Sequence, residues 1–216
     1  MSTIEIIPSI LTNKVQEASE LIGRCDGVVR RVQIDVIDGV FANNKTVLPE
    51  DIDIQDVSVA MDFHLMVDSP IDWVERCVNA KADRIIGQIE MMDDQMEFID
   101  MVQKNNLRVG IAIDLDTPVS KINPDVFGIV DVILVMSVKA GFGGQEFNLK
   151  ALDKVIELSK IRDDKSAPFR ICIDGGVNKN NIADIENSGA NEVVIGRILF
   201  DGPIKDNISK LEGSLE

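Results

Sequence analysis

Eight short β-rich runs recur along the chain at intervals of roughly 23 to 37 residues, which is the length of a strand–helix–strand unit. The segments between several of these runs have the apolar spacing of amphipathic helices. This alternation predicts an α/β fold built around parallel strands. The runs cover residues 4–7, 32–36, 59–66, 84–89, 108–113, 132–136, 169–173 and 192–196.

The intervening segments carry signals for helix ends. Thr12 and Asn13 offer a capping side chain before the first predicted helix, Pro70 stands near the first turn of the second, and Gly189 follows the last. Helices are predicted over residues 14–26, 71–80, 93–105, 149–162 and 181–188.

About eight β/α units in 216 residues fit a (β/α)8 TIM barrel. A doubly wound open sheet also alternates strands and helices, but it needs fewer strands. It also favours a GxGxxG turn after the first strand, which PSILTN does not resemble. Because no linker or composition break is visible, residues 1–216 are predicted to form one barrel domain.

Charge and hydropathy limit the classes of partner. A net charge of −15 disfavours nucleic acid and anionic membranes, so an anionic substrate would have to be held by local groups. No apolar run reaches the ~18 residues of a membrane span, and MSTIEIIPSIL lacks the basic start of a signal peptide. We therefore expect a cytoplasmic protein. Cys25, Cys77 and Cys172 are far apart in the sequence and are expected to be reduced.

Three polar side chains interrupt otherwise apolar predicted strands. Asp35 lies in VQIDVIDG, His64 in MDFHLM and Asp174 in FRICIDGG, each on the face opposite the apolar stripe. Each stands at or near the carboxyl end of its strand, where barrel active sites form. Taken singly, an Asp can cap a turn and a lone His can be structural. Their shared position on three strands favours chemistry.

Glycine-rich loops follow three of the later strands. They are GFGG at 141–144, DGG at 174–176 and VIGR at 194–197. Glycine lets the backbone N–H groups approach a phosphate closely, and barrel phosphate sites commonly use the last two loops. The pattern predicts a phosphorylated ligand.

Two carboxylates and an imidazole can hold a divalent cation such as zinc, iron or manganese. Beside a phosphorylated keto-sugar, a cation would polarise the carbonyl group, and a carboxylate on each side of the adjacent carbon could remove and return its proton. This chemistry is epimerisation. His64 is the only histidine and has no nucleophile motif nearby, so a Ser–His–Asp hydrolase is not supported.

The motifs that carry this chemistry resemble the ribulose-phosphate 3-epimerase family over nearly the whole chain. They are PSIL (8–11), IDVIDGVF (34–41), DFHLMV (62–67), VMSVKAGFGGQEF (135–147) and IDGGVN (173–178), followed by a GA…V.G..LF ending (189–200). The resemblance implies a (β/α)8 barrel that interconverts D-ribulose 5-phosphate and D-xylulose 5-phosphate with a divalent metal.

The resemblance also implies roles for individual residues. Asp35 and Asp174 would be both metal ligands and the acid/base pair, and His64 would be a third ligand. Substrate contacts are implied for Ser9, His64, Met66, Met136, Gly141, Phe142, Gly143, Gly144, Gly175, Gly176, Gly196 and Arg197. A homo-oligomer is implied as well.

The chain departs from the family pattern at several of these positions. Gln33 and Gln88 replace histidines, Ile37 replaces a methionine, Lys139-Ala140 replaces Asn-Pro, and Arg197 replaces a serine. Gln33 is therefore a doubtful metal ligand, because an amide oxygen is neutral and binds zinc-like metals less well than imidazole does. We expect a weaker metal site, or one shifted toward Mn²⁺ or Mg²⁺. The alternatives are an epimerase of another ketose phosphate and a catalytically impaired homologue that binds a sugar phosphate.

Overall fold

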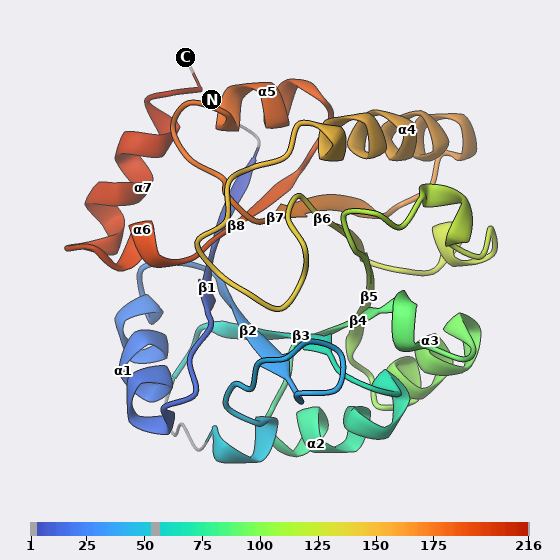
Figure 1. The fold of residues 1–216 in the computed structure, drawn as a ribbon, viewed down its shortest axis with the longest axis horizontal. Helices are drawn as coiled ribbons and strands as arrows, with labels where there is room; N and C mark the ends of the chain where they lie inside the picture. Colours follow the sequence, from blue (N-terminus) through green and yellow to red (C-terminus); the bar gives the residue numbers. More distant parts are fainter. Residues whose placement is uncertain (1–3, 53–56, 216) are drawn as a thin grey trace.

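The computed structural model describes residues 4–52 and 57–215 and shows eight parallel strands closed into a barrel (Figure 1). Each strand pairs with the next along the chain, and β1 also pairs with β8, which closes the ring. The predicted TIM barrel is therefore confirmed. The strands are β1 Glu5–Ile10, β2 Arg31–Ile37, β3 Ala60–Met66, β4 Arg84–Gln88, β5 Arg108–Ile113, β6 Val132–Met136, β7 Arg170–Asp174 and β8 Glu192–Ile195.

The helices form an outer layer around the barrel (Figure 1). They are α1 Val15–Cys25, α2 Val74–Asn79, α3 Gln95–Lys104, α4 Lys150–Lys165, α5 Ile182–Asn187, α6 Arg197–Phe200 and α7 Ile204–Glu212. Short 3₁₀ helices cover Pro49–Asp51, Pro70–Trp73, Ile89–Met91, Val119–Lys121 and Val126–Gly128. The five predicted helices are present with ends shifted by a few residues, whereas α6 and α7 were not predicted.

Two details of the helix prediction are wrong. The helix expected over residues 71–80 begins as the 3₁₀ helix Pro70–Trp73 and becomes α-helical only at Val74. Thr12 does not cap α1, because its Oγ1 accepts from the Lys14 N–H, and Lys14 is itself the N-cap residue, without a side-chain cap. Both errors arise because helix ends are set by local backbone geometry that short sequence motifs describe poorly.

The strands separate two apolar clusters. The larger lies between strands and helices and contains alternate strand residues such as Val32, Ile34 and Phe63. The smaller lies inside the barrel around Ile7 and Leu134. Because side chains alternate along a strand, the remaining strand positions all face the interior, where the polar residues collect.

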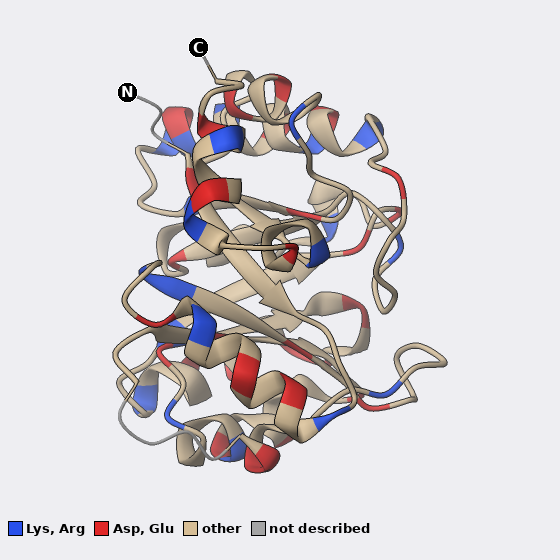
Figure 2. Ribbon diagram, turned by 90° about the vertical axis from the view of Figure 1, so that its left-hand side faces the viewer, with Lys and Arg blue, Asp and Glu red and all other residues tan. Residues whose placement is uncertain are grey.

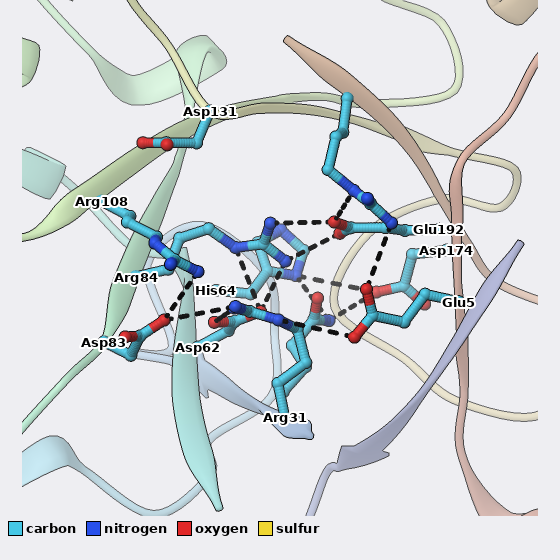
Figure 3. A network of polar contacts seen from close by, with 12 residues as sticks. Glu5, Arg31, Asp62, His64, Asp83, Arg84, Arg108, Asp131, Asp174 and Glu192 are labelled. Carbon is cyan, nitrogen blue, oxygen red and sulfur yellow. Dashed lines mark hydrogen bonds and ion pairs between the residues drawn. The ribbon is translucent and has the colours of Figure 1, made fainter. Parts of the chain in front are cut away.

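An ion-pair network fills the end of the barrel where the strands begin (Figure 3). Arg84 of β4 reaches Asp62 of β3 at 2.6 Å and Glu192 of β8 at 2.8 Å, and all three side chains are almost fully buried. Arg31 pairs with Asp62 and Arg170 with Glu192, each at 2.5 Å. Buried charges are tolerated when they are paired in this way.

The outer face carries acidic and basic residues on its helices and loops (Figure 2). All three cysteines are buried and free, in agreement with the expectation that they are reduced. Among the described residues, no helix is long and apolar enough to cross a bilayer.

Removal of the central cation of the network should destabilise the fold. In Arg84→Met, Asp62 and Glu192 each lose a buried partner, and we expect the free energy of unfolding in urea to fall by about 3–5 kcal/mol. The matched control is Arg108→Met, because Arg108 is exposed and only 3.6 Å from Asp83 at the same end of the barrel. This control should change stability by less than about 1 kcal/mol. Equal losses in the two variants would contradict the prediction.

Candidate active site

The three chemically suggestive side chains meet inside the carboxyl end of the barrel. Asp35 and His64 are paired in the register of β2 and β3, and Asp174 ends β7. His64 Nδ1 lies 3.2 Å from Asp35 Oδ1 and 3.8 Å from Asp174 Oδ2. One ligand atom of each residue lies within 4.8 Å of the other two. The predicted convergence is confirmed, while the roles of the three residues stay predictions.

Gln88 of β4 determines which nitrogen of His64 faces the aspartates. The Gln88 amide satisfies its surroundings when its oxygen accepts from His64 Nε2 at 3.1 Å and its nitrogen donates to Glu90 Oε2 at 2.7 Å. Nε2 then carries a proton, and Nδ1 is the ring nitrogen that faces Asp35 and Asp174. The sequence analysis noted Gln88 only as a departure and missed this orienting role.

Gln33 of β2 donates to both aspartates from a single nitrogen. Its Nε2 lies 2.8 Å from Asp35 Oδ1 and 2.7 Å from Asp174 Oδ2. The same nitrogen is 3.4 Å from His64 Nδ1. Gln33 therefore belongs to the cluster, as a hydrogen-bond donor.

Two hydroxyl groups fix the backbone that carries the aspartates. Thr46 Oγ1 donates to the Asp35 carbonyl at 2.7 Å and accepts from the Ile37 N–H at 2.9 Å. Ser137 Oγ donates to the Asp174 carbonyl at 2.9 Å and also contacts the Gly175 carbonyl. The ends of β2 and β7 are thus held by Thr46, in the loop after β2, and by Ser137, which directly follows β6. The sequence motifs did not indicate either contact.

Burial and the neighbouring carboxylate of Asp35 raise the pKa of Asp174 from its ordinary value of 3.8 to about 7. His64 and the hydrogen bond from Gln33 offset only part of this increase. Without further positive charge, the cluster therefore retains a proton near neutral pH.

The donor set of this cluster fits a divalent cation. Two carboxylates and the imidazole of His64 converge on one small volume, and this combination suits zinc, iron or manganese. Two carboxyl groups this close to each other favour the binding of additional positive charge. Asp35, His64 and Asp174 are the residues that could hold a metal ion.

A cavity of about 1050 Å³ opens above the cluster. Asp35 and Asp174 line its floor, while His64 and Gln33 are fully buried beneath it. The other predicted substrate-contact residues all line this cavity: Ser9, Met66, Met136, Gly141, Phe142, Gly143, Gly144, Gly175, Gly176, Gly196 and Arg197. Leu11, Arg24 and Asn178 also line it and were not predicted.

Two loops meet over the mouth of the barrel. Asn44, after β2, donates through Nδ2 to the Gly141 carbonyl at 2.8 Å, and Gly141 (φ +106°) packs against Ala42 so closely that a Cβ there would clash. The loop that contains Gly141 crosses the barrel end in yellow in Figure 1. The cavity is therefore partly covered by chain segments 97 residues apart.

Arg197 supplies positive charge to this cavity. Its guanidinium lies against Gly144, where a Cβ would clash with Nη2, and Gly144 has a φ of +78° that favours glycine. Among the described residues, no carboxylate forms an ion pair with Arg197, although the chain has 37 acidic residues. An exposed arginine without a partner beside glycine-rich loops is suited to binding an anion.

Comparison with known proteins agrees with this geometry. A sequence model described as the ribulose-phosphate 3 epimerase family matches residues 5–200. The chain belongs to the ribulose-phosphate 3-epimerase family. Ribulose-phosphate 3-epimerase of Bacillus subtilis is 30% identical over 98% of this chain and 99% of its own length. The Escherichia coli K12 enzyme is 34% identical over 80% of this chain and 77% of its own. The expected enzyme class, an epimerase, is confirmed.

Solved structures support the fold alone. A 3-hexulose-6-phosphate synthase superposes with a TM-score of 0.67 at 14% identity over 99% of this chain and all of its own. A 3-keto-L-gulonate-6-phosphate decarboxylase from Vibrio cholerae gives a TM-score of 0.68 at 13% identity over 100% of this chain and 98% of its own.

The pKa of Asp174 predicts how the stability of metal-free protein depends on pH. The folded-state value of about 7 exceeds the ordinary 3.8, so the folded chain holds a proton that the unfolded chain releases between about pH 4 and 7. This contribution to stability is present at low pH and is lost as the pH rises through 7. In EDTA-treated protein, the Tm of the wild type minus that of Asp174→Asn should therefore fall from pH 5 to pH 8. Parallel profiles would refute the assignment.

Proposed function

We propose that this enzyme interconverts D-ribulose 5-phosphate and D-xylulose 5-phosphate by moving a proton at C3. The observation that carries the proposal is the pair Asp35 and Asp174, held at the floor of a cavity whose lining includes glycine-rich loops and the exposed Arg197. Membership of the family supports this choice of substrate over other ketose phosphates.

The proton transfer is assigned to the two aspartates. One carboxylate removes the C3 proton, and the electron pair moves onto the C2 carbonyl oxygen to give an enediolate. The other carboxyl group, protonated at the start, returns a proton to the opposite face of C3, and the two groups exchange protonation states. The raised pKa of Asp174, to about 7, is consistent with one protonated and one ionised carboxyl group near neutral pH.

A divalent cation completes the proposed site, with Asp35, His64 and Asp174 as its ligands. When bound, it supplies the positive charge that polarises the substrate carbonyl and stabilises the enediolate. We propose that Gln33, which is neutral, leaves this site weaker than one built with a histidine there. The preference would then shift from zinc or iron toward Mn²⁺ or Mg²⁺.

Substrate binding is assigned to the rim of the cavity. The phosphate is proposed to bind the backbone N–H groups of Gly143, Gly144, Gly175, Gly176 and Gly196, together with the Arg197 guanidinium. Ser9, Met66, Met136, Gly141 and Phe142 are proposed to contact the sugar. A cytoplasmic location and a homo-oligomeric state remain predictions.

Loss of either aspartate should stop the reaction. Asp35→Asn and Asp174→Asn should each lower kcat for D-ribulose 5-phosphate by about 10²- to 10⁴-fold, because the proton acceptor or donor is lost. A coupled assay with Mn²⁺ measures turnover, and deuterium uptake at C3 from D₂O reports the proton transfer itself. Asp164→Asn, an exposed change on α4, is the control. Full deuterium uptake in either active-site variant would contradict the assignment.

Removal of the arginine should weaken binding without slowing chemistry. Arg197→Met should raise KM for D-ribulose 5-phosphate by about 10- to 100-fold, the effect of one lost charge-assisted contact, with kcat little changed. Arg108→Met, at the opposite end of the barrel, should leave both parameters unchanged. An unchanged KM in Arg197→Met would show that the phosphate binds elsewhere.

The rival functions have their own support. The position of Gln33 among the metal-ligating atoms favours a catalytically impaired sugar-phosphate-binding homologue, and the loop after β2 could select another ketose phosphate. Turnover of a ketohexose 6-phosphate in preference to D-ribulose 5-phosphate would favour the second. Phosphate-ligand binding without turnover of any ketose phosphate would favour the first.

A further inference from the structure

Three acceptor atoms in the candidate active site surround one side-chain nitrogen. Gln33 Nε2 lies between 2.7 and 3.4 Å from Asp174 Oδ2, Asp35 Oδ1 and His64 Nδ1. These atoms belong to the three residues that could hold a metal ion, and Gln33, Asp35 and His64 are at most 4% exposed. The amide nitrogen thus occupies the centre of the proposed ligand set.

The network determines that the nitrogen, and not the oxygen, of the Gln33 amide faces this centre. An oxygen in the same position would lie within 2.8 Å of two carboxylate oxygens and would have nothing to donate to them. With the nitrogen there, one N–H is donated to each aspartate. These are charge-assisted bonds in a buried site, which are the stronger kind.

A cation and this amide cannot use the same space. Zinc-like metals lie about 2.0–2.2 Å from their oxygen and nitrogen ligands. An ion held that closely by these atoms of Asp35, His64 and Asp174 would overlap Nε2, which lies 2.7 to 3.4 Å from them, and the N–H dipoles would repel it. For an ion to enter, the carboxamide must turn or withdraw, with loss of both hydrogen bonds.

We infer that Gln33 is an internal competitor for the metal position, which holds Asp35 and Asp174 together in the metal-free protein and must be displaced before a cation binds. Gln33 is thus a positioning residue that takes over the cation's structural role of bridging two anionic groups. The inference rests on the proposed function for its ligand set, but it concerns cation binding and does not depend on turnover.

The competing view is that Gln33 is an ordinary fourth ligand that binds the metal through Oε1. The two views predict changes of opposite sign. If Gln33 competes, Gln33→Met should tighten Mn²⁺ binding, because the ion no longer displaces an internal donor. If Gln33 is a ligand, the same change should weaken Mn²⁺ binding, because a coordinating oxygen is lost.

The test is the dissociation constant of Mn²⁺ for EDTA-treated protein at pH 7.5, measured by competition with a chelating indicator. We expect Gln33→Met to bind Mn²⁺ about 10- to 100-fold more tightly than the wild type does, the range typical of partners of metal ligands. Gln88→Met is the matched control, because Gln88 is an equally buried glutamine whose amide bonds with His64, Glu90 and the Ala112 carbonyl. Its affinity should not rise.

Thermal stability provides a second test if Gln33→Met and the wild type differ little in their affinity for Mn²⁺. The Tm of metal-free Gln33→Met should fall, since Asp35 and Asp174 lose their shared donor, and the rise in Tm on addition of Mn²⁺ should be larger than for the wild type. Weaker or unchanged Mn²⁺ binding in Gln33→Met, or equal tightening in Gln88→Met, would overturn the inference.

Turnover tests the proposed function, and Mn²⁺ binding tests the role of Gln33, so the two can fail separately. Wild-type turnover of D-ribulose 5-phosphate combined with weakened Mn²⁺ binding in Gln33→Met would retain the epimerase and reject the competitor. Tightened Mn²⁺ binding without turnover of any ketose phosphate would do the reverse.

Discussion

The pairing of β1 with β8 is the constraint on which the rest of the structure depends. Asp35 is on β2 and Asp174 on β7, and these strands come to the same part of the barrel only because β1 and β8 pair between them. In an open sheet with the same strand order, the two carboxylates would lie near opposite edges. Closure of the barrel brings Asp35 and Asp174 together as one buried pair. Because both groups are acidic, the site favours the binding of positive charge.

The two ends of the barrel interior handle buried charge in opposite ways. Where the strands begin, Arg84 lies between Asp62 and Glu192 and is supported by Arg31 and Arg170, so each acid has a cationic partner. Where the strands end, two carboxyl groups and an imidazole surround the neutral amide of Gln33. The first arrangement is satisfied internally and is suited to rigidity, whereas the second is completed only by something that binds, which is typical of functional sites.

Gln33 is a residue of β2 that donates hydrogen bonds to both proposed catalytic aspartates. Gln33 is a neutral hydrogen-bond donor at a position where the family pattern has histidine. It bridges the two aspartates by hydrogen bonds, whereas a bound ion would bridge them by coordination. Neighbouring residues hold the groups around this amide in place: Thr46 fixes the backbone of Asp35, and Gln88 accepts from Nε2 of His64, so that Nδ1 faces the centre. In this cluster, the Gln33 side chain can bridge Asp35 and Asp174 or be displaced by a cation.

Sequence patterns were enough to predict the barrel, the strand ends that carry Asp35, His64 and Asp174, and the glycine-rich loops around the cavity. Such features follow from hydrophobic periodicity and from backbone preferences, which are local properties of a chain. It could not reveal the hydrogen-bond partners of Gln33 and Gln88, the network of Arg84 or the position of Arg197 against Gly144. These depend on which side chains from remote strands meet at one depth in the barrel, and on where each polar hydrogen points. Only the tertiary structure decided them, because register and closure bring together atoms that no sequence spacing relates.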